Sequence, residues 1–123
     1  MNDQTARPAM TMREIREGLG HATPGLPDVD VIVTRYEVSL LPLNDVNRKY
    51  FTLYVERTRR GMWIVNDGHG GYDIDGDWAP GLAVAHEFND YDDAIALARR
   101  LAPNVTINGH TAADAYRRTH PTT

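Results

Sequence analysis

Residues 49–67, KYFTLYVERTRRGMWIVND, contain the clearest structural pattern of this chain. Apolar and polar side chains alternate in its first half, which places Leu53 and Val55 on one side of an extended strand. The second half repeats this alternation with Trp63 and Val65. The charged connection between the halves ends in glycine, as hairpin loops do. The stretch therefore predicts two antiparallel strands with one apolar face.

The residues on either side of this hairpin extend the predicted sheet. Upstream, VIVTRYEVSLLP (residues 31–42) alternates until a proline and predicts a strand. Downstream, HGGYDIDGDWAP (residues 69–80) has an Asp-Gly pair at its centre and predicts a smaller hairpin, with Trp78 covering the sheet. LAVAHEF (residues 82–88) supplies another short strand.

Two helices are predicted after the sheet. Residues 89–103 offer Asn89 or Asp90 as the N-cap, acidic residues in the first turn, and a proline at the end. One apolar stripe on this helix should pack on the sheet. Further on, the pair Asn108-Gly109 indicates a turn, and a capping-box pattern predicts a short helix over residues 112–119.

These elements predict the α+β class. We expect a twisted antiparallel sheet of four to five strands with one helix packed on a face, and a short C-terminal hairpin and helix. Residues 31–123 form a single domain, and residues 1–30 are a tail or short helix plus linker, with Met12, Ile15 and Leu19 on one helical face. The predicted core consists of Tyr36, Val38, Leu40, Phe51, Leu53, Val55, Trp63, Val65, Phe88, Ile95, Ala98 and Leu101.

The composition narrows the function classes. The chain has 123 residues, no cysteine and a formal net charge of −4, which argues against thiol chemistry and against coating of nucleic acid. Its longest apolar runs are far shorter than the roughly 20 residues that span a bilayer. The N-terminal residues lack the apolar core of a secretory signal, so we expect a cytoplasmic protein without a membrane partner.

VNDGHGGYDIDGDW, residues 65–78, is the stretch in which chemistry would be sought. Its aspartates do not match a calcium loop, because the glycine and glutamate that such a loop requires are absent from their positions. We interpret these aspartates as turn formers and predict no metal, no cofactor and no enzymatic activity. The sequence leaves open whether the aspartates of residues 67–77 form a weak metal site with His69 or His86.

The second and third predicted strands carry the candidate binding surface. Tyrosine and arginine are frequent at binding hot spots, and five such residues fall on this hairpin: Tyr50, Tyr54, Arg57, Arg59 and Arg60. The first hypothesis is a non-enzymatic protein that binds another protein. The alternative is a DNA- or RNA-binding module that uses an arginine-tipped β-hairpin. The oligomeric state stays open, since an exposed edge strand could pair two copies.

The whole pattern also resembles a group of small uncharacterised proteins of actinobacterial phages and prophages. The resemblance covers residues 33–116 and rests on the arm Arg60 to Trp63, the D-G-D-W turn, the H-x-F strand end and the segment L-A-P-x-V-T-x-N-G. It implies a small α+β protein in the cytoplasm of a bacterial host, with no activity established for the group. A host or phage protein would then be the partner.

Overall fold

The computed structural model describes residues 25–121, and the chain divides into two units, Met1–Ile32 and Val33–Thr123. In the first unit, the described residues include four exposed apolar side chains, Leu26, Val29, Val31 and Ile32. The predicted helix with Met12, Ile15 and Leu19 lies outside the described residues.

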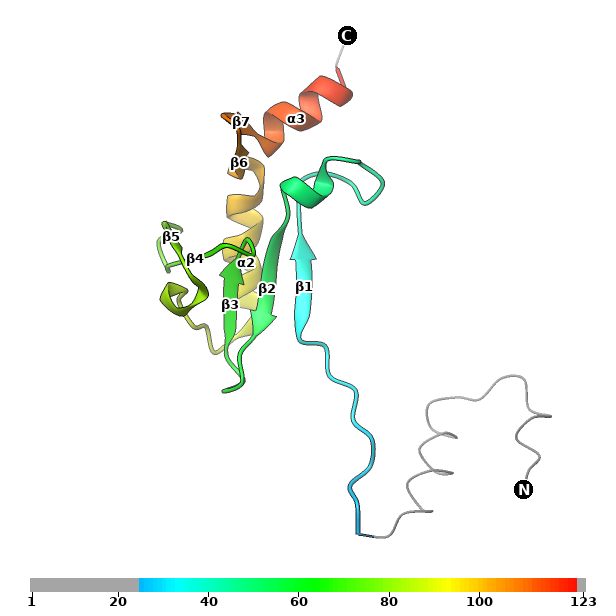
Figure 1. The fold of residues 1–123 in the computed structure, drawn as a ribbon, viewed down its shortest axis with the longest axis vertical. Helices are drawn as coiled ribbons and strands as arrows, with labels where there is room; N and C mark the ends of the chain where they lie inside the picture. Colours follow the sequence, from blue (N-terminus) through cyan, green and yellow to red (C-terminus); the bar gives the residue numbers. More distant parts are fainter. Residues whose placement is uncertain (1–24, 122–123) are drawn as a thin grey trace, which may run out of the picture. The chain divides into compact units, whose positions relative to one another are not determined.

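The second unit is built on a five-stranded antiparallel sheet with the strand order β1-β2-β3-β4-β5 (Figure 1). A second sheet has two strands, β6 and β7. The strands are β1 Arg35–Val38, β2 Leu53–Arg57, β3 Trp63–Asn66, β4 Gly70–Tyr72, β5 Trp78–Pro80, β6 Thr106–Ile107 and β7 His110–Thr111. With the two helices given below, this architecture confirms the predicted α+β class.

The β2–β3 hairpin forms as its sequence predicts. Val55 pairs with Val65, so that both apolar side chains lie on one face. The turn closes through a hydrogen bond from the Gly61 amide to the Thr58 carbonyl, and Gly61 has a φ of 81°. Glycine adopts this left-handed conformation without the steric cost that a side chain would add.

Helix α2, Tyr91–Leu101, packs against β2 and β3 (Figure 1). The Asp90 side chain caps it by accepting a hydrogen bond from the Asp92 amide. The main core consists of Leu53, Val55, Val65, Ala94, Leu97 and Ala98. Leu97 is absent from the predicted core, although it lies three positions after Ala94 and therefore on the same face of the helix.

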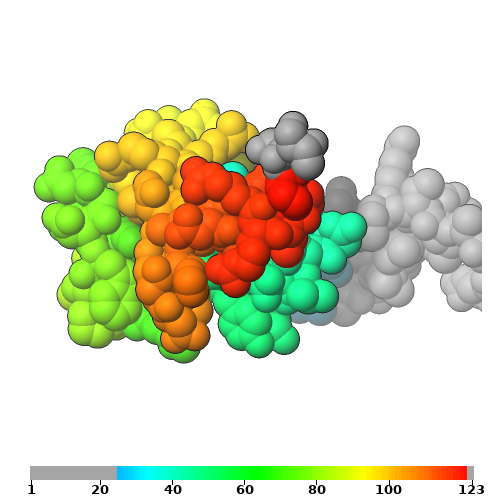
Figure 2. Space-filling view, turned by 90° about the horizontal axis from the view of Figure 1, so that it is seen from above, coloured from blue at the N-terminus to red at the C-terminus, as the bar shows by residue number. Residues whose placement is uncertain are grey.

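A smaller core lies beneath the C-terminal elements. Helix α3, Ala112–Thr119, begins with the predicted capping box, and the β6–β7 turn has positive φ at Asn108 and Gly109. Figure 2 shows α3 and this hairpin lying side by side over one end of the unit. The second cluster consists of Leu41, Phe51, Ala112 and Ala115. Val105 packs against both clusters and joins them.

The first predicted strand is longer than the observed one. Leu40 is 38% exposed and does not join the core as predicted, and Ile32, near the start of the predicted strand, lies outside the observed one and is 54% exposed. The Ser39 hydroxyl donates to the Phe51 carbonyl and accepts from the Leu41 amide. These two bonds turn the chain after Val38, and Leu41 becomes buried in place of its neighbour.

Two further predictions about strands are wrong. Residues 82–88 form a 3-10 turn, Leu82–Val84, and an isolated bridge from Phe88 to Trp63. The alternation in residues 49–57 predicts a second strand from Tyr50, but Tyr50 ends the 3-10 turn Arg48–Tyr50 and the strand begins at Leu53. Trp78 lies in β5 and is 47% exposed, with its ring in the space that a Cβ atom on Gly70 would occupy.

Candidate functional site

The structure separates the five predicted binding residues into two groups. Tyr50 ends the turn that precedes β2, while Arg59 and Arg60 lie in the β2–β3 turn at the opposite end of that strand (Figure 1). Tyr54 lies between these two ends. The five residues therefore do not form one patch.

The arginine group lies at the hairpin tip. Arg57, Arg59 and Arg60 are exposed. The Arg60 guanidinium binds both carboxylate oxygens of Glu87, at 2.6 and 2.5 Å. The alternation of β2 places Arg57 on the same side as Val55, which is opposite to the side of Tyr54. The tip is thus locally basic, and one of its three charges is neutralised.

Tyr54 lies on the outer face of the sheet, which is the face opposite α2. The Arg35 guanidinium lies 3.8 Å from the centre of the Tyr54 ring, in a cation–π contact. Glu37 is the residue of β1 directly opposite Tyr54. The alternation of residues 50–56 predicts that Thr52 shares this outer, exposed face, but Thr52 is 5% exposed and donates its hydroxyl hydrogen to the Arg48 carbonyl.

A groove of about 400 Å³ lies next to Tyr54. Its lining residues are Glu37, Leu43, Asp45, Val46, Arg48, Lys49, Thr52 and Tyr54, and we call it the Tyr54 groove. Leu43 and Val46 are 84% and 82% exposed, the largest exposures among the described large apolar residues. Figure 2 shows the loop that carries them at the surface beside α3.

Hydrogen bonds hold this apolar loop in one shape. The Asp45 amide donates to the Pro42 carbonyl, and the Asp45 carboxylate accepts from the Asn47 amide. The Arg48 amide donates to the Asp45 carbonyl, and the Arg48 guanidinium donates to the Leu41 carbonyl. Leu43 and Val46 are therefore presented to solvent on an ordered loop.

The charges of the Tyr54 groove balance. Its lining holds two carboxylates, Glu37 and Asp45, and two cations, Arg48 and Lys49. Arg48 Nε lies 3.5 Å from the nearer Glu37 oxygen. A phosphate backbone would find no excess of positive charge here, whereas a mixed surface of another protein would find partners for both signs.

The aspartates of the turn after β4 gather in one place. One carboxylate oxygen from each of Asp73, Asp75 and Asp77 lies within 4.8 Å of the others. The same Asp73 oxygen accepts hydrogen bonds from the amides of Asp75 and Asp77, both at 2.9 Å. This arrangement is the turn-forming role that the sequence predicts for these aspartates.

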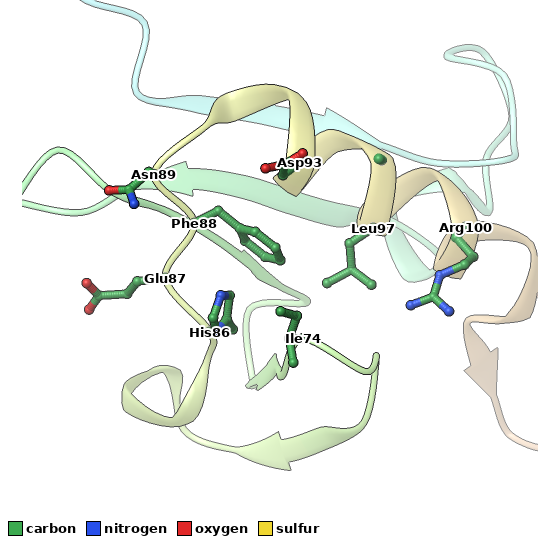
Figure 3. A pocket seen from close by; sticks show the side chains of 9 residues that line it. Ile74, His86, Glu87, Phe88, Asn89, Asp93, Leu97 and Arg100 are labelled. Atoms are coloured by element: carbon green, nitrogen blue, oxygen red, sulfur yellow. The ribbon is translucent and has the colours of Figure 1, made fainter.

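The two central histidines do not converge with these aspartates. His86 lines a pocket of about 670 Å³ between α2 and the aspartate turn, where it points toward Ile74 and packs edge-on against Phe88 (Figure 3). Glu87 points away from this group (Figure 3), and its carboxylate accepts hydrogen bonds from Arg60. His69 lines a different pocket. The constellation of His69, His86 and the aspartates is therefore not formed.

The pocket that His69 lines contains a half-buried tyrosine. It measures about 530 Å³ and is also lined by Lys49, Asp67, Tyr72 and Trp78. Burial, together with the charge of Asp67, raises the pKa of Tyr72 from 10.0 to about 12. Tyr72 is therefore a neutral hydrogen-bonding group at physiological pH and not a general base.

Sequence reasoning did not identify three residues that shape the Tyr54 groove and its surroundings. Leu43 and Val46 lie between two predicted strands, where two apolar residues among turn-forming neighbours are a signal of an exposed contact. Arg35 was assigned only to a strand, and its contact with Tyr54 depends on the pairing of β1 with β2.

Comparison with known proteins adds no relative. No family model matches the sequence, and neither a curated protein nor a solved structure matches the chain. Within residues 25–121, no helix is long and apolar enough to cross a membrane.

Proposed function

We propose that this protein acts by binding another protein through the Tyr54 groove, without catalysing a reaction. The observation that supports the proposal most is the exposure of Leu43 and Val46 on a hydrogen-bonded loop. An ordered loop loses little conformational entropy on binding, so apolar area buried there contributes more of its free energy to affinity. Tyr54, predicted from the sequence, lines this groove and would serve as an aromatic anchor, whereas Tyr50 is not among its lining residues.

The resemblance to phage proteins suggests the partner class and the compartment. The partner is then a host or phage protein in the cytoplasm of a bacterium, and the protein modulates it stoichiometrically. The balanced charge of the groove supports a protein partner over a nucleic acid.

The arginine tip supports a second candidate function, the binding of DNA or RNA. Three exposed arginines on one hairpin turn are the observation that favours it. The ion pair of Arg60 with Glu87 weakens this candidate, because a phosphate would have to compete with a carboxylate that already occupies the guanidinium.

Affinity capture with matched variants tests both candidates. The tagged protein is incubated with bacterial lysate, with or without nuclease, and eluted in salt steps. Leu43→Asp should lower retention of the partner at least about tenfold, because a charge replaces an apolar contact. Leu82→Asp makes the same change at another exposed leucine and should retain the partner.

The outcomes separate the two functions. Retention through nuclease and high salt, lost only in Leu43→Asp, supports the groove. Loss of the bound material with nuclease or salt, together with loss in an Arg59→Glu/Arg60→Glu variant, would favour nucleic acid. Equal loss in the two leucine variants would refute the groove as the binding surface.

A further inference from the structure

The outer edge of β1 presents main-chain groups that no described strand covers. β1 stands at the end of the strand order, and β2 is its one neighbour among the described strands. The Arg57 amide donates to the Thr34 carbonyl, and in antiparallel pairing the residues that bond one neighbour alternate. Tyr36 and Val38 therefore face β2, while Arg35 and Glu37 direct their amide and carbonyl groups outward. A free edge of this kind is a template for another strand.

We propose that this edge pairs with the β1 edge of a second copy of the chain, in an antiparallel dimer in which Arg35 lies opposite Glu37 of the second copy. A twofold axis through Tyr36 generates this arrangement, because a symmetric edge contact is antiparallel by construction. The two Arg35–Glu37 pairs would share about four main-chain hydrogen bonds. The five-stranded sheet would then continue into a ten-stranded one across the axis.

Charge selects this register over its neighbours. A shift of two residues in one direction places Arg35 opposite the same arginine, and the opposite shift places Glu37 opposite the same glutamate. Directly opposed like charges destabilise a strand pair, whereas opposite charges stabilise it. A shift of one residue would place the outward-directed amide and carbonyl groups of one copy opposite residues of the other copy whose amide and carbonyl groups already bond β2. The sequence Arg-Tyr-Glu is therefore self-complementary in one register only.

The surroundings of the edge favour a second copy over an unrelated strand. Both charged side chains are exposed, and that of Glu37 retains 55% of its accessible surface even beside Arg48. An unrelated strand would have to match their order of charge, which an identical copy does by symmetry. Val33, which lies just before β1, is 54% exposed, and pairing of two copies would remove part of its apolar surface from water.

The interface is short, so we expect a weak dimer. Contacts below about 1,200 Å² are characteristic of transient association. A dissociation constant on the order of 10–100 µM is a reasonable magnitude for such an edge. Sedimentation velocity should then show a monomer–dimer equilibrium of the purified protein between about 10 µM and 1 mM.

Register-specific crosslinking is the direct test. Because the chain has no cysteine of its own, any disulfide must join the introduced cysteines. Arg35→Cys and Glu37→Cys variants are purified separately, mixed, and oxidised. In the proposed register the two introduced cysteines lie about 5.5 Å apart between Cα atoms, within disulfide range. Two copies of Arg35→Cys would be roughly 9 Å apart, outside that range. We therefore expect disulfide-linked dimers in the mixture and almost none in either variant alone.

A charge swap supplies the second test. Glu37→Arg places arginine opposite arginine and should weaken dimerisation at least about tenfold, and Arg35→Glu/Glu37→Arg should restore it. Crosslinking that is equal in all mixtures, absent from all of them, or unaffected by the swap would overturn the proposed dimer. These experiments use the purified protein alone, so their failure would leave the test of the Tyr54 groove unaffected.

Discussion

Gly71 packs so closely against Ala85 that a single added methyl group should destabilise the fold. A Cβ atom built on Gly71 would lie 2.5 Å from the Cβ of Ala85 and 3.0 Å from its Cα and N atoms. Apolar carbon atoms normally approach to about 3.5–4.0 Å, so Gly71→Ala forces β4 and the Ala85 segment apart. Overpacking of this kind costs typically 1–3 kcal/mol, and the lower entropy of the unfolded alanine chain returns about 0.4–1 kcal/mol. We expect a net loss of about 1–2 kcal/mol in the free energy of unfolding.

The compensating change distinguishes this mechanism from a general effect of glycine replacement. Ala85→Gly alone removes a buried methyl group and loosens the backbone, at a cost of about 1.5 kcal/mol. The double variant removes the contact at 2.5 Å but keeps those to the Ala85 backbone, so rescue should be incomplete. A coupling of about 1–2 kcal/mol is expected between the two sites.

Urea unfolding followed by tryptophan fluorescence measures all three variants. Ala83→Gly, an exposed site in the same segment, gives the cost of the backbone effect alone. The slope against urea should stay constant, which shows that the unfolded state is comparable. Strict additivity of the two changes, or a Gly71→Ala variant as stable as the unmodified protein, would show that Ala85 does not lie against β4.

Three further results are expected. Leu53→Ala, at a position with 0% exposure in the main core, should lower the free energy of unfolding by about 2–5 kcal/mol, measured in the same urea experiment. Because the pKa of Tyr72 is raised in the folded state, its contribution to stability is fully present below pH 10 and is lost as pH rises toward about 12. The loss in the free energy of unfolding should be about 1 kcal/mol, a value reduced because the group is only half-buried. Tyr72→Phe should abolish this alkaline loss in unfolding experiments. Hydrogen bonds from the Thr111 amide and hydroxyl lower the pKa of Asp114 below 3.8. The contribution of Asp114 to folding stability is therefore present above pH 3.8 and is lost as pH falls through the lowered pKa. Asp114→Asn should reduce the loss of helix that circular dichroism detects at acid pH.

The elements that the sequence predicted well are those that local chemistry determines. The alternation around Val55, the glycine of the β2–β3 turn, the cap at Asp90 and the capping box at Thr111 each act within a few residues. A pattern of this range can be identified without knowing the rest of the fold. The predicted core was mostly correct for the same reason, since side-chain alternation defines one face of a strand.

The errors occurred where distant residues set the outcome. The Ser39 hydroxyl bends the chain because it donates to the Phe51 carbonyl, twelve positions away. As a result Leu41 is buried and Leu40 is exposed, and no pattern in the neighbouring sequence indicates this. The predicted binding surface was divided for a similar reason. A strand beginning at Tyr50 would have aligned the tyrosines with the hairpin, but the 3-10 turn displaces Tyr50 to the loop that carries Leu43.

Val105 contacts both hydrophobic clusters, and this position has a consequence for local stability. The smaller cluster has only four buried members, two of them alanines. Such a unit can open while the sheet and α2 stay folded, since few apolar contacts resist it. Amide hydrogen exchange should therefore be faster over α3 than over β2 and β3. Val105 couples the stability of one cluster to that of the other. Truncating its side chain should therefore let the amides of α3 exchange independently of those in the sheet and α2.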